Sequence, residues 1–425
     1  MKRFLIGSKN IDRSSYIWNM AGTTIMAFQS VVLLMVITRV LGLKDSGTFT
    51  IAYANANLLL IMGKYGMHNF HVSDTENIFN FGDYRTARYI TTASMLVAAV
   101  AYSVSAFLLN DYTPGKALII FWMCLFKSVD ALEDVYCSLY QKQGRLDISG
   151  KMMTTRVVIT MIFFIVSILV TRNLLISVIA STVFTFVLFL LLNLICKKMF
   201  SDSINEKCQS SRVTKLLVAC SGLFVIGFLS YYITNAPKYA IDAQLSDELQ
   251  ACYGFISMPV FVIGLMGNYL FNPIIKALSE KWSNGDFAWF TSRLIRQTIV
   301  VVSITVICLG GAYLLGIPVL SLIYGTDLSG YKTELLILLA GGGLLALANQ
   351  FMTIITIIRR QKWLLIGYFV CAIAALICSP IVVANYSVMG AAMLELVLMF
   401  CLCIFFAVVL MVSITRAKKN FVPKS

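Results

Sequence analysis

Four charged side chains lie close together in a stretch that is otherwise apolar: Lys127, Asp130, Glu133 and Asp134, within CLFKSVDALEDVY. A charge at the centre of a membrane helix costs about 2.5 to 3.5 kcal/mol on insertion, so such residues are rare and are by default candidates for a functional site. In a helix, Lys127, Asp130 and Asp134 share one face and Glu133 lies on its flank. We therefore expect this face to meet protein or water rather than lipid.

Two interpretations of these charges are open from the residues alone. They could form internal ion pairs that hold this helix to a neighbour, or they could line a hydrated path across the membrane. In the second case Asp130, Glu133 and Asp134 would either couple transport to protons or balance the charge of Lys127.

The composition places these residues in a membrane protein. The chain has 425 residues, of which 59% are hydrophobic and only 13% are charged, against roughly 25% charged in an ordinary soluble domain. Its mean hydropathy is +0.83. Apolar stretches of the roughly 20 residues that span a bilayer recur along the whole chain, so no separate soluble domain is expected.

The apolar stretches predict twelve membrane helices, and the weakest division is a very tight turn at Thr171, Arg172 and Asn173. The predicted ranges are 16–41, 46–66, 87–109, 116–140, 152–171, 173–196, 214–236, 249–275, 294–316, 333–358, 363–384 and 388–413.

Basic residues concentrate in the segments that face the cytoplasm if the N-terminus lies inside, which is the usual bias of membrane proteins. Arg85 and Arg88 at the third predicted helix, and Lys151 and Arg156 at the fifth, belong to this group. Both termini are therefore expected to be cytoplasmic. The net charge of +14 then reflects topology and attraction to anionic lipid, and no nucleic-acid partner is needed to explain it.

The longest polar connection, residues 197–215, follows the sixth predicted helix. It predicts two six-helix lobes, 1–200 and 201–425, that enter the membrane from the same side as parallel repeats. Polar residues at membrane depth, including Asn55 and Asn235, fall in both halves, as a central polar cavity would require.

Several chemistries find no support in the sequence. It has no G-x-x-x-x-G-K-[ST] motif, so nucleotide hydrolysis is not the expected energy source. His68, His71 and Asp74 offer two imidazoles without a fixed further ligand, so no metal site is predicted, and no cofactor is expected. The eleven cysteines are scattered through apolar spans as small core residues. A passive or gradient-coupled carrier, not an enzyme, is the expectation.

Three segments resemble the polysaccharide repeat-unit flippases of the multidrug/oligosaccharidyl-lipid/polysaccharide exporter superfamily. The first is TRVLGLKDSGTFTIAYANANLLLIMGKYG, with Arg39, Leu41, Gly42, Gly47 and Phe49 in the pattern R-x-L-G-x-x-x-x-G-x-F. The second, residues 231–274, carries the run Asn235, Ala236, Pro237, Lys238, Tyr239 and Asp242. The third, IPVLSLIYGTDLSGYK, is similar to the loop before the tenth helix of that branch.

The resemblance implies two six-helix lobes around a central cavity that opens alternately to each side of a bacterial plasma membrane. The implied substrate is an undecaprenyl-diphosphate-linked oligosaccharide, and a polysaccharide polymerase with its export machinery would be the partners. A diphosphate needs cations within the membrane and sugars need hydrogen-bonding groups. The candidate substrate-binding residues are therefore Arg39, Lys64, Lys127, Lys238, Asn55 and Asn235, with Lys127 the strongest single candidate.

Two other classes stay open at this stage. A cation-coupled drug antiporter of the same superfamily would favour a carboxylate-dominated cavity, with little need of Arg39 and Lys127. A membrane glycan polymerase or ligase would change the length of the glycan chain chemically.

Overall fold

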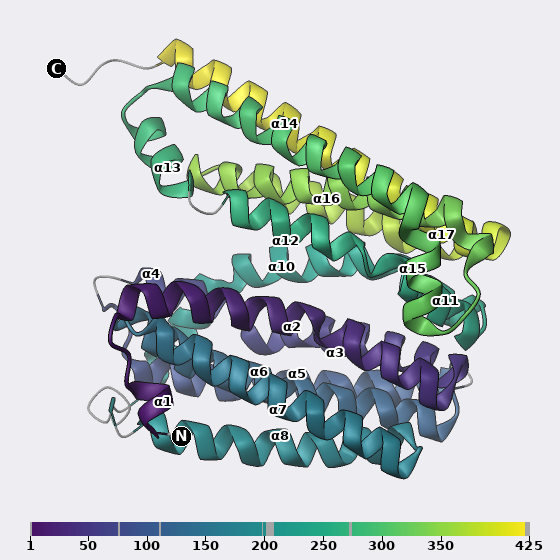
Figure 1. Ribbon diagram of the computed structural model, residues 1–425. Helices are drawn as coiled ribbons and strands as arrows, with labels where there is room; N and C mark the ends of the chain where they lie inside the picture. Colours follow the sequence, from purple (N-terminus) through teal and green to yellow (C-terminus); the bar gives the residue numbers. More distant parts are fainter. Residues whose placement is uncertain are drawn as a thin grey trace. The chain divides into compact units, whose positions relative to one another are not determined.

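The computed structural model describes residues 2–74, 77–109, 112–197, 199–200, 208–271 and 274–420. Within these ranges the chain forms helices joined by short connections and contains no strand (Figure 1). It divides into two compact units, Met1–Phe228 and Leu229–Ser425. The predicted boundary after residue 200 adjoins residues 201–207, which lie outside the described residues, and it stays a prediction.

The first unit is a bundle of helices (Figure 1). They are α1 (Lys2–Ile6), α2 (Ile11–Leu41), α3 (Leu43–Lys64), α4 (Met67–Ser73), α5 (Phe81–Leu109), α6 (Pro114–Lys142), α7 (Leu146–Thr171), α8 (Leu174–Lys197) and the first part of α10 (Ser210–Gln244). Helix α6 contacts α3, α4, α5, α7 and α8. Because it has neighbours on so many sides, α6 can carry polar side chains that lipid would not tolerate.

Local signals in the sequence fix both ends of α6. The Thr113 side chain accepts a hydrogen bond from the backbone N–H of Lys116 at 3.3 Å, and Pro114 occupies the first turn, where its missing N–H is not needed. After Lys142 the chain reverses through Gly144, whose φ of 75° suits glycine. Helix α7 starts at Leu146 and returns along the bundle.

The tight turn predicted around Arg172 is confirmed. Helix α7 ends at Thr171 and α8 begins at Leu174, while Arg172 adopts a left-handed conformation with φ 47°. Asn173 caps the new helix by accepting a hydrogen bond from the N–H of Ile176 at 3.1 Å.

The second unit contains the rest of α10 followed by a second set of helices. They are α11 (Asp247–Ser257), α12 (Val260–Phe271), α13 (Ile275–Ser283), α14 (Phe287–Gly311), the π-helix η2 (Ala312–Gly316), α15 (Ile317–Tyr324), the 3-10 turn η3 (Ser329–Tyr331), α16 (Lys332–Ile357) and α17 (Gln361–Asn420). Helix α16 packs against α12, α14 and α17.

Pro237, Pro259 and Pro273 stand in or beside the seventh and eighth predicted membrane helices, where a proline can break or bend a helix. Pro259 lies between α11 and α12 and divides the predicted range 249–275, whereas α10 continues as a helix through Pro237. Pro273 lies outside the described residues. The prediction of a loop over 317–332 is wrong in its first half, because Ile317–Tyr324 forms helix α15. This helix tolerates Pro318 because the proline stands in its first turn, where its missing N–H is not needed.

Among the described residues, nine helical stretches are long and apolar enough to cross a membrane, which makes the chain a multi-pass membrane protein. Helices α3 and α6 fall outside this group because polar and charged residues interrupt them. Helix α17 covers two predicted spans, and they meet at the non-helical Ser387 (φ 52°). That all twelve predicted ranges cross the membrane, and that both termini are cytoplasmic, stay predictions.

Candidate functional site: a charge network around helix α6

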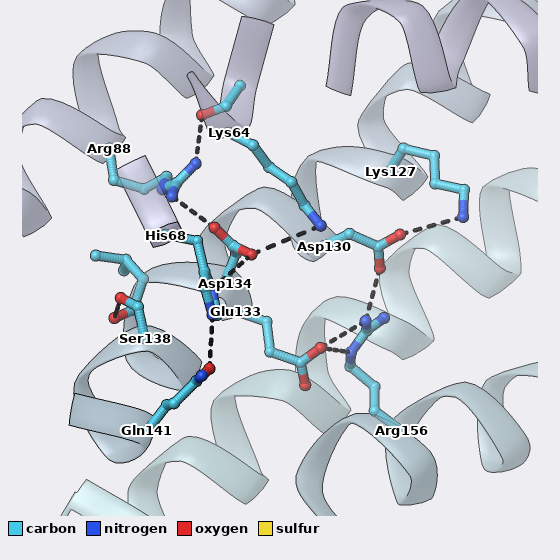
Figure 2. Close-up of polar contacts among 12 residues, drawn as sticks. Lys64, His68, Arg88, Lys127, Asp130, Glu133, Asp134, Ser138, Gln141 and Arg156 are labelled. Carbon is cyan, nitrogen blue, oxygen red and sulfur yellow. Dashed lines mark hydrogen bonds and ion pairs between the residues drawn. The ribbon is translucent and has the colours of Figure 1, made fainter. Parts of the chain in front are cut away.

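The charged face of α6 is turned toward neighbouring helices of the first unit (Figure 2). Lys127, Asp130 and Glu133 are 1%, 5% and 3% exposed, so the expectation that this face avoids lipid is confirmed. Two interpretations of these charges were open from the sequence, an ion-pair cluster and a hydrated path. In the first unit the charged residues of α6 form ion pairs.

The deeply buried end of the network is built around Asp130. Its Oδ2 accepts a hydrogen bond from Lys127 Nζ at 3.1 Å, and its Oδ1 accepts one from Arg156 Nη2 at 2.6 Å. Arg156, on α7, also donates to Glu133 Oε2 from Nε at 2.9 Å and from Nη2 at 2.7 Å. Charge-assisted bonds of this kind, with both partners buried, hold α6 and α7 in one register.

Lys127 has two further partners besides Asp130. Its Nζ donates to Gln29 Oε1 of α2 at 3.2 Å and lies 4.6 Å from the centre of the Tyr53 ring of α3. Lys127 therefore ties α6 to α2 and α3. In this conformation its ammonium group is fully engaged, and its predicted role in binding substrate stays a prediction.

The other end of the network is built around Asp134 and is partly exposed. Asp134 Oδ2 accepts a hydrogen bond from Arg88 Nη2 of α5 at 2.7 Å, while Oδ1 lies 3.1 Å from His68 Nδ1 and 3.6 Å from Lys64 Nζ. The exposed fractions of the side chains are 0% for Arg88, 11% for Asp134, 28% for His68 and 34% for Lys64. This end lies toward the C-terminal ends of α3 and α6, which the sequence predicts to be cytoplasmic.

Arg88 is fixed from a second side. Its Nη1 donates to the carbonyl oxygen of Gly63 at 2.7 Å, and the Thr91 hydroxyl donates to the same oxygen at 2.8 Å. Its Nε is buried and has no hydrogen-bond partner among the described residues. Arg88 thus anchors Asp134 to α3 and α5 and keeps one unused donor.

The two histidines of α4 make separate contacts with α6. His68 bridges Asp134 and Gln141, with Nε2 3.0 Å from Gln141 Oε1. Burial alone would lower the pKa of His68, but the hydrogen bond and charge of Asp134 raise it above the ordinary value of 6.5. His71 instead contacts the Ser138 hydroxyl at 2.8 Å, and burial, with the charge of Lys142, lowers its pKa to about 3.

The sequence analysis counted Arg88 and Arg156 among the charges of cytoplasmic segments and did not name them as site residues; the side of the membrane on which they lie stays a prediction. They are 0% and 2% exposed and belong to the network. The reason is that α5 begins at Phe81 and α7 at Leu146, so both arginines lie about two to three turns inside their helices. One signal pointed to them: the α6 face carries a single cation for its carboxylates, so neighbouring helices had to supply more.

The remaining candidates of the first unit lie apart from the network. Arg39 is exposed in the last turn of α2. Asn55 is buried on α3 and donates through Nδ2 to the Tyr102 hydroxyl of α5 at 3.1 Å. This contact makes Asn55 an interhelical hydrogen-bonding residue.

The candidates of the second unit lie on α10. Asn235 is 7% exposed and donates through Nδ2 to the carbonyl oxygen of Tyr231 at 3.0 Å, within its own helix. Lys238 is half-buried and within electrostatic reach of Glu395 on α17. Glu395 is itself buried and accepts a hydrogen bond from the Tyr253 hydroxyl at 2.6 Å. The second unit thus holds its own buried carboxylate, which the sequence analysis did not count among the site residues.

No protein-family profile matches this chain, and no curated protein matches it in sequence. Solved structures match it over nearly its whole length, and they are transporters. The lipid II flippase MurJ, in an inward closed conformation, superposes with a TM-score of 0.67 at 12% identity, covering 94% of this chain and 90% of MurJ. The chain therefore has the fold of these membrane transporters.

Two further matches have the same fold. The Vibrio cholerae MATE transporter VcmN, in its bent form, gives a TM-score of 0.59 at 13% identity, covering 96% of this chain and 97% of VcmN. A MOP superfamily transporter from Pyrococcus furiosus, described as having a binding pocket of reverse polarity, gives 0.58 at 11% identity, covering 99% of each chain. The fold is thus shared by proteins named as a MATE transporter, a MOP superfamily transporter and a lipid II flippase.

Proposed function

We propose that this protein is a flippase for lipid-linked oligosaccharides. It would carry undecaprenyl-diphosphate-linked repeat units of a capsule, exopolysaccharide or cell-wall polysaccharide from the cytoplasmic to the outer leaflet of a bacterial cell membrane. The substrate site would be exposed alternately to each side, and the protein would make or break no covalent bond.

The charge composition of the α6 network is the observation that carries this proposal. Its cations, Lys64, Arg88, Lys127 and Arg156, outnumber its carboxylates, Asp130, Glu133 and Asp134, before His68 is counted (Figure 2). An excess of positive charge among membrane helices is costly unless an anion is bound for part of the cycle. A lipid diphosphate supplies such an anion within the thickness of the membrane.

The exposed end of the network is the place where the substrate would bind. Lys64 and His68 are the partly exposed members, whereas Lys127 and Arg156 are buried against carboxylates. We assign Lys64 as the first contact for the diphosphate. In this conformation we assign Lys127 the role of holding α6 to α2 and α3. Arg39, Lys238, Asn55 and Asn235 stay proposals for contacts with substrate or lipid headgroups.

The fold shared with MurJ supports a lipid-linked substrate, since that protein is named as a lipid II flippase. The fold shared with MATE transporters favours one other candidate, a cation-coupled drug antiporter. Transport of a cationic drug would require a site with an excess of carboxylates, which the α6 network lacks. Cation-driven dye efflux from vesicles containing this protein would support the antiporter.

Deletion of the gene tests the proposal. Lipid-linked repeat units should accumulate in cells that lack the protein, and surface polysaccharide should be lost, with both effects reversed by the intact gene. A membrane polymerase or ligase would instead change the chain length when the purified protein is incubated with lipid-linked repeat units. Normal surface polysaccharide and no accumulation would rule out the proposed function.

A further inference from the structure

Asp134 is held by basic side chains contributed by three different helices. Lys64 comes from α3, His68 from α4 and Arg88 from α5, and all approach the same carboxylate (Figure 2). Protein phosphate sites use the same groups: charged nitrogens that converge on the oxygens of one anion. In this conformation the anion between them is the protein's own side chain.

The three contacts differ in tightness. Arg88 donates at 2.7 Å, is fully buried and is fixed by the Gly63 carbonyl. Lys64 Nζ lies 3.6 Å from Asp134, beyond an ordinary hydrogen bond, and 34% of its side chain is exposed. His68 is intermediate, at 3.1 Å with 28% of its side chain exposed. Lys64 and His68, the partly exposed half of this site, can therefore bind another anion while Arg88 stays bound to Asp134.

A diphosphate would compete well for this exposed half. It carries more negative charge than a carboxylate and more acceptor oxygens, so Lys64 and a protonated His68 gain by exchanging one anion for the other. The carboxylate would keep Arg88, whose buried Nε gives it a spare donor among the described contacts.

We propose that Asp134 is an internal competitor for the substrate's phosphate. It occupies Lys64 and His68 when no substrate is bound, and the diphosphate displaces it from these two residues during loading. Asp134 balances part of the positive charge of the exposed end in the empty protein. The exchange also gives the substrate a site whose affinity is limited, so that it can be released on the other side. The assignment of the displacing anion rests on the proposed function.

Binding of inorganic pyrophosphate to the purified protein in detergent, at about pH 6 where His68 is protonated, tests the exchange. Asp134→Asn removes the competing charge and should bind pyrophosphate about tenfold more tightly than the unaltered protein. Asp286→Asn is the matched control, because Asp286 is also paired with a lysine, Lys281 at 2.9 Å, but lies on the surface of the second unit. It should leave the affinity unchanged, and an Asp134→Asn protein that binds no more tightly than this control overturns the proposal.

A second measurement needs no variant and decides the matter if Asp134→Asn fails to fold. Lys64 of the unaltered protein should react with an amine acylating reagent, and pyrophosphate should slow that reaction about tenfold. Lys281, with 43% of its side chain exposed, is the internal control and should react at the same rate throughout. Equal acylation of Lys64 with and without pyrophosphate contradicts the exchange.

The two proposals can fail separately. In one outcome, pyrophosphate protects Lys64 in the purified protein while lipid-linked repeat units do not accumulate in deletion cells. That result would support the exchange and rule out the oligosaccharide substrate. Accumulation without protection would keep the flippase and make Asp134 a structural partner of Arg88.

Discussion

Arg156 of α7 donates to Asp130 of α6 at 2.6 Å, and both side chains are almost fully buried. The same guanidinium binds Glu133 through two nitrogens, so one arginine pairs with two carboxylates. Its removal would leave both charges in the bundle with only Lys127 to compensate.

Arg156→Ala should therefore lower the stability of the protein by about 3 to 5 kcal/mol, the usual result of breaking a buried ion pair. Thermal unfolding of the purified protein in detergent measures the effect. Arg296→Ala, at an exposed position of α14, is the control and should change stability little. Equal unfolding temperatures for the two variants would show that the Arg156 pairs do not stabilise the fold.

Lys64 and Lys127 should respond differently to the same substitution. Lys64→Gln removes a partly exposed cation whose contact with Asp134 is long, so abundance in the membrane should stay normal while transport falls at least about tenfold. Lys127→Gln removes a buried cation with several partners, so abundance should fall. Immunoblotting of membranes beside surface polysaccharide separates the two effects. A Lys127→Gln protein at full abundance without transport would restore Lys127 as the substrate residue.

His68 gives the stability a definite pH dependence. Its folded pKa is raised above the unfolded value of 6.5, so its contribution is full below about pH 6.5 and is lost as the pH rises through the folded pKa. Unfolding temperatures measured from pH 6 upward should therefore fall, and His68→Asn should flatten this part of the curve.

His71 should act in the opposite direction. Its folded pKa is about 3, so its contribution is present above pH 6.5 and is lost as the pH falls from 6.5 toward 3. His71→Asn should weaken the acid loss and leave the curve above pH 7 as it is in the unaltered protein. If His68→Asn changed the acid part of the curve and His71→Asn the part above pH 7, the pKa directions assigned to the two histidines would be wrong.

Gly150 lies where the backbones of α2 and α7 are in close contact. A Cβ at this position would lie 2.6 Å from the Trp18 carbonyl carbon, so Gly150→Ala must push two backbones apart and should lower the unfolding temperature. Gly222 in α10 has open space around it, and there the same change should be neutral or stabilising, because alanine favours helix by up to about 1 kcal/mol. Equal responses at both positions would contradict the packing of α2 on α7.

Part of this structure could be predicted from the sequence. The apolar lengths indicated the helices, and the tight turn at Arg172 followed from the limit that bilayer thickness places on a span. The charged face of α6 was expected to avoid lipid because of the cost of its charges. These conclusions depend on local patterns, which one sequence contains.

The partners of α6 could not be predicted in the same way. Arg88 and Arg156 were placed among the cytoplasmic charges because the starts of α5 and α7 were set about two turns too late. Ion pairs between two helices depend on how far one helix is shifted along the other, and the hydropathy of the sequence does not give this shift. The excess of carboxylates on α6 was the one local sign that buried cations were missing.

The side of the membrane on which lipid-linked repeat units lie tests the central proposal most directly. Periodate, which does not cross the membrane, oxidises only the glycans exposed on the outer leaflet of intact cells. We predict that repeat units are protected from periodate in cells that lack this protein, become reactive when it is restored, and stay protected when Lys64→Gln is supplied instead. Repeat units that are equally reactive in all three strains would contradict a role for this protein, and for Lys64, in their translocation.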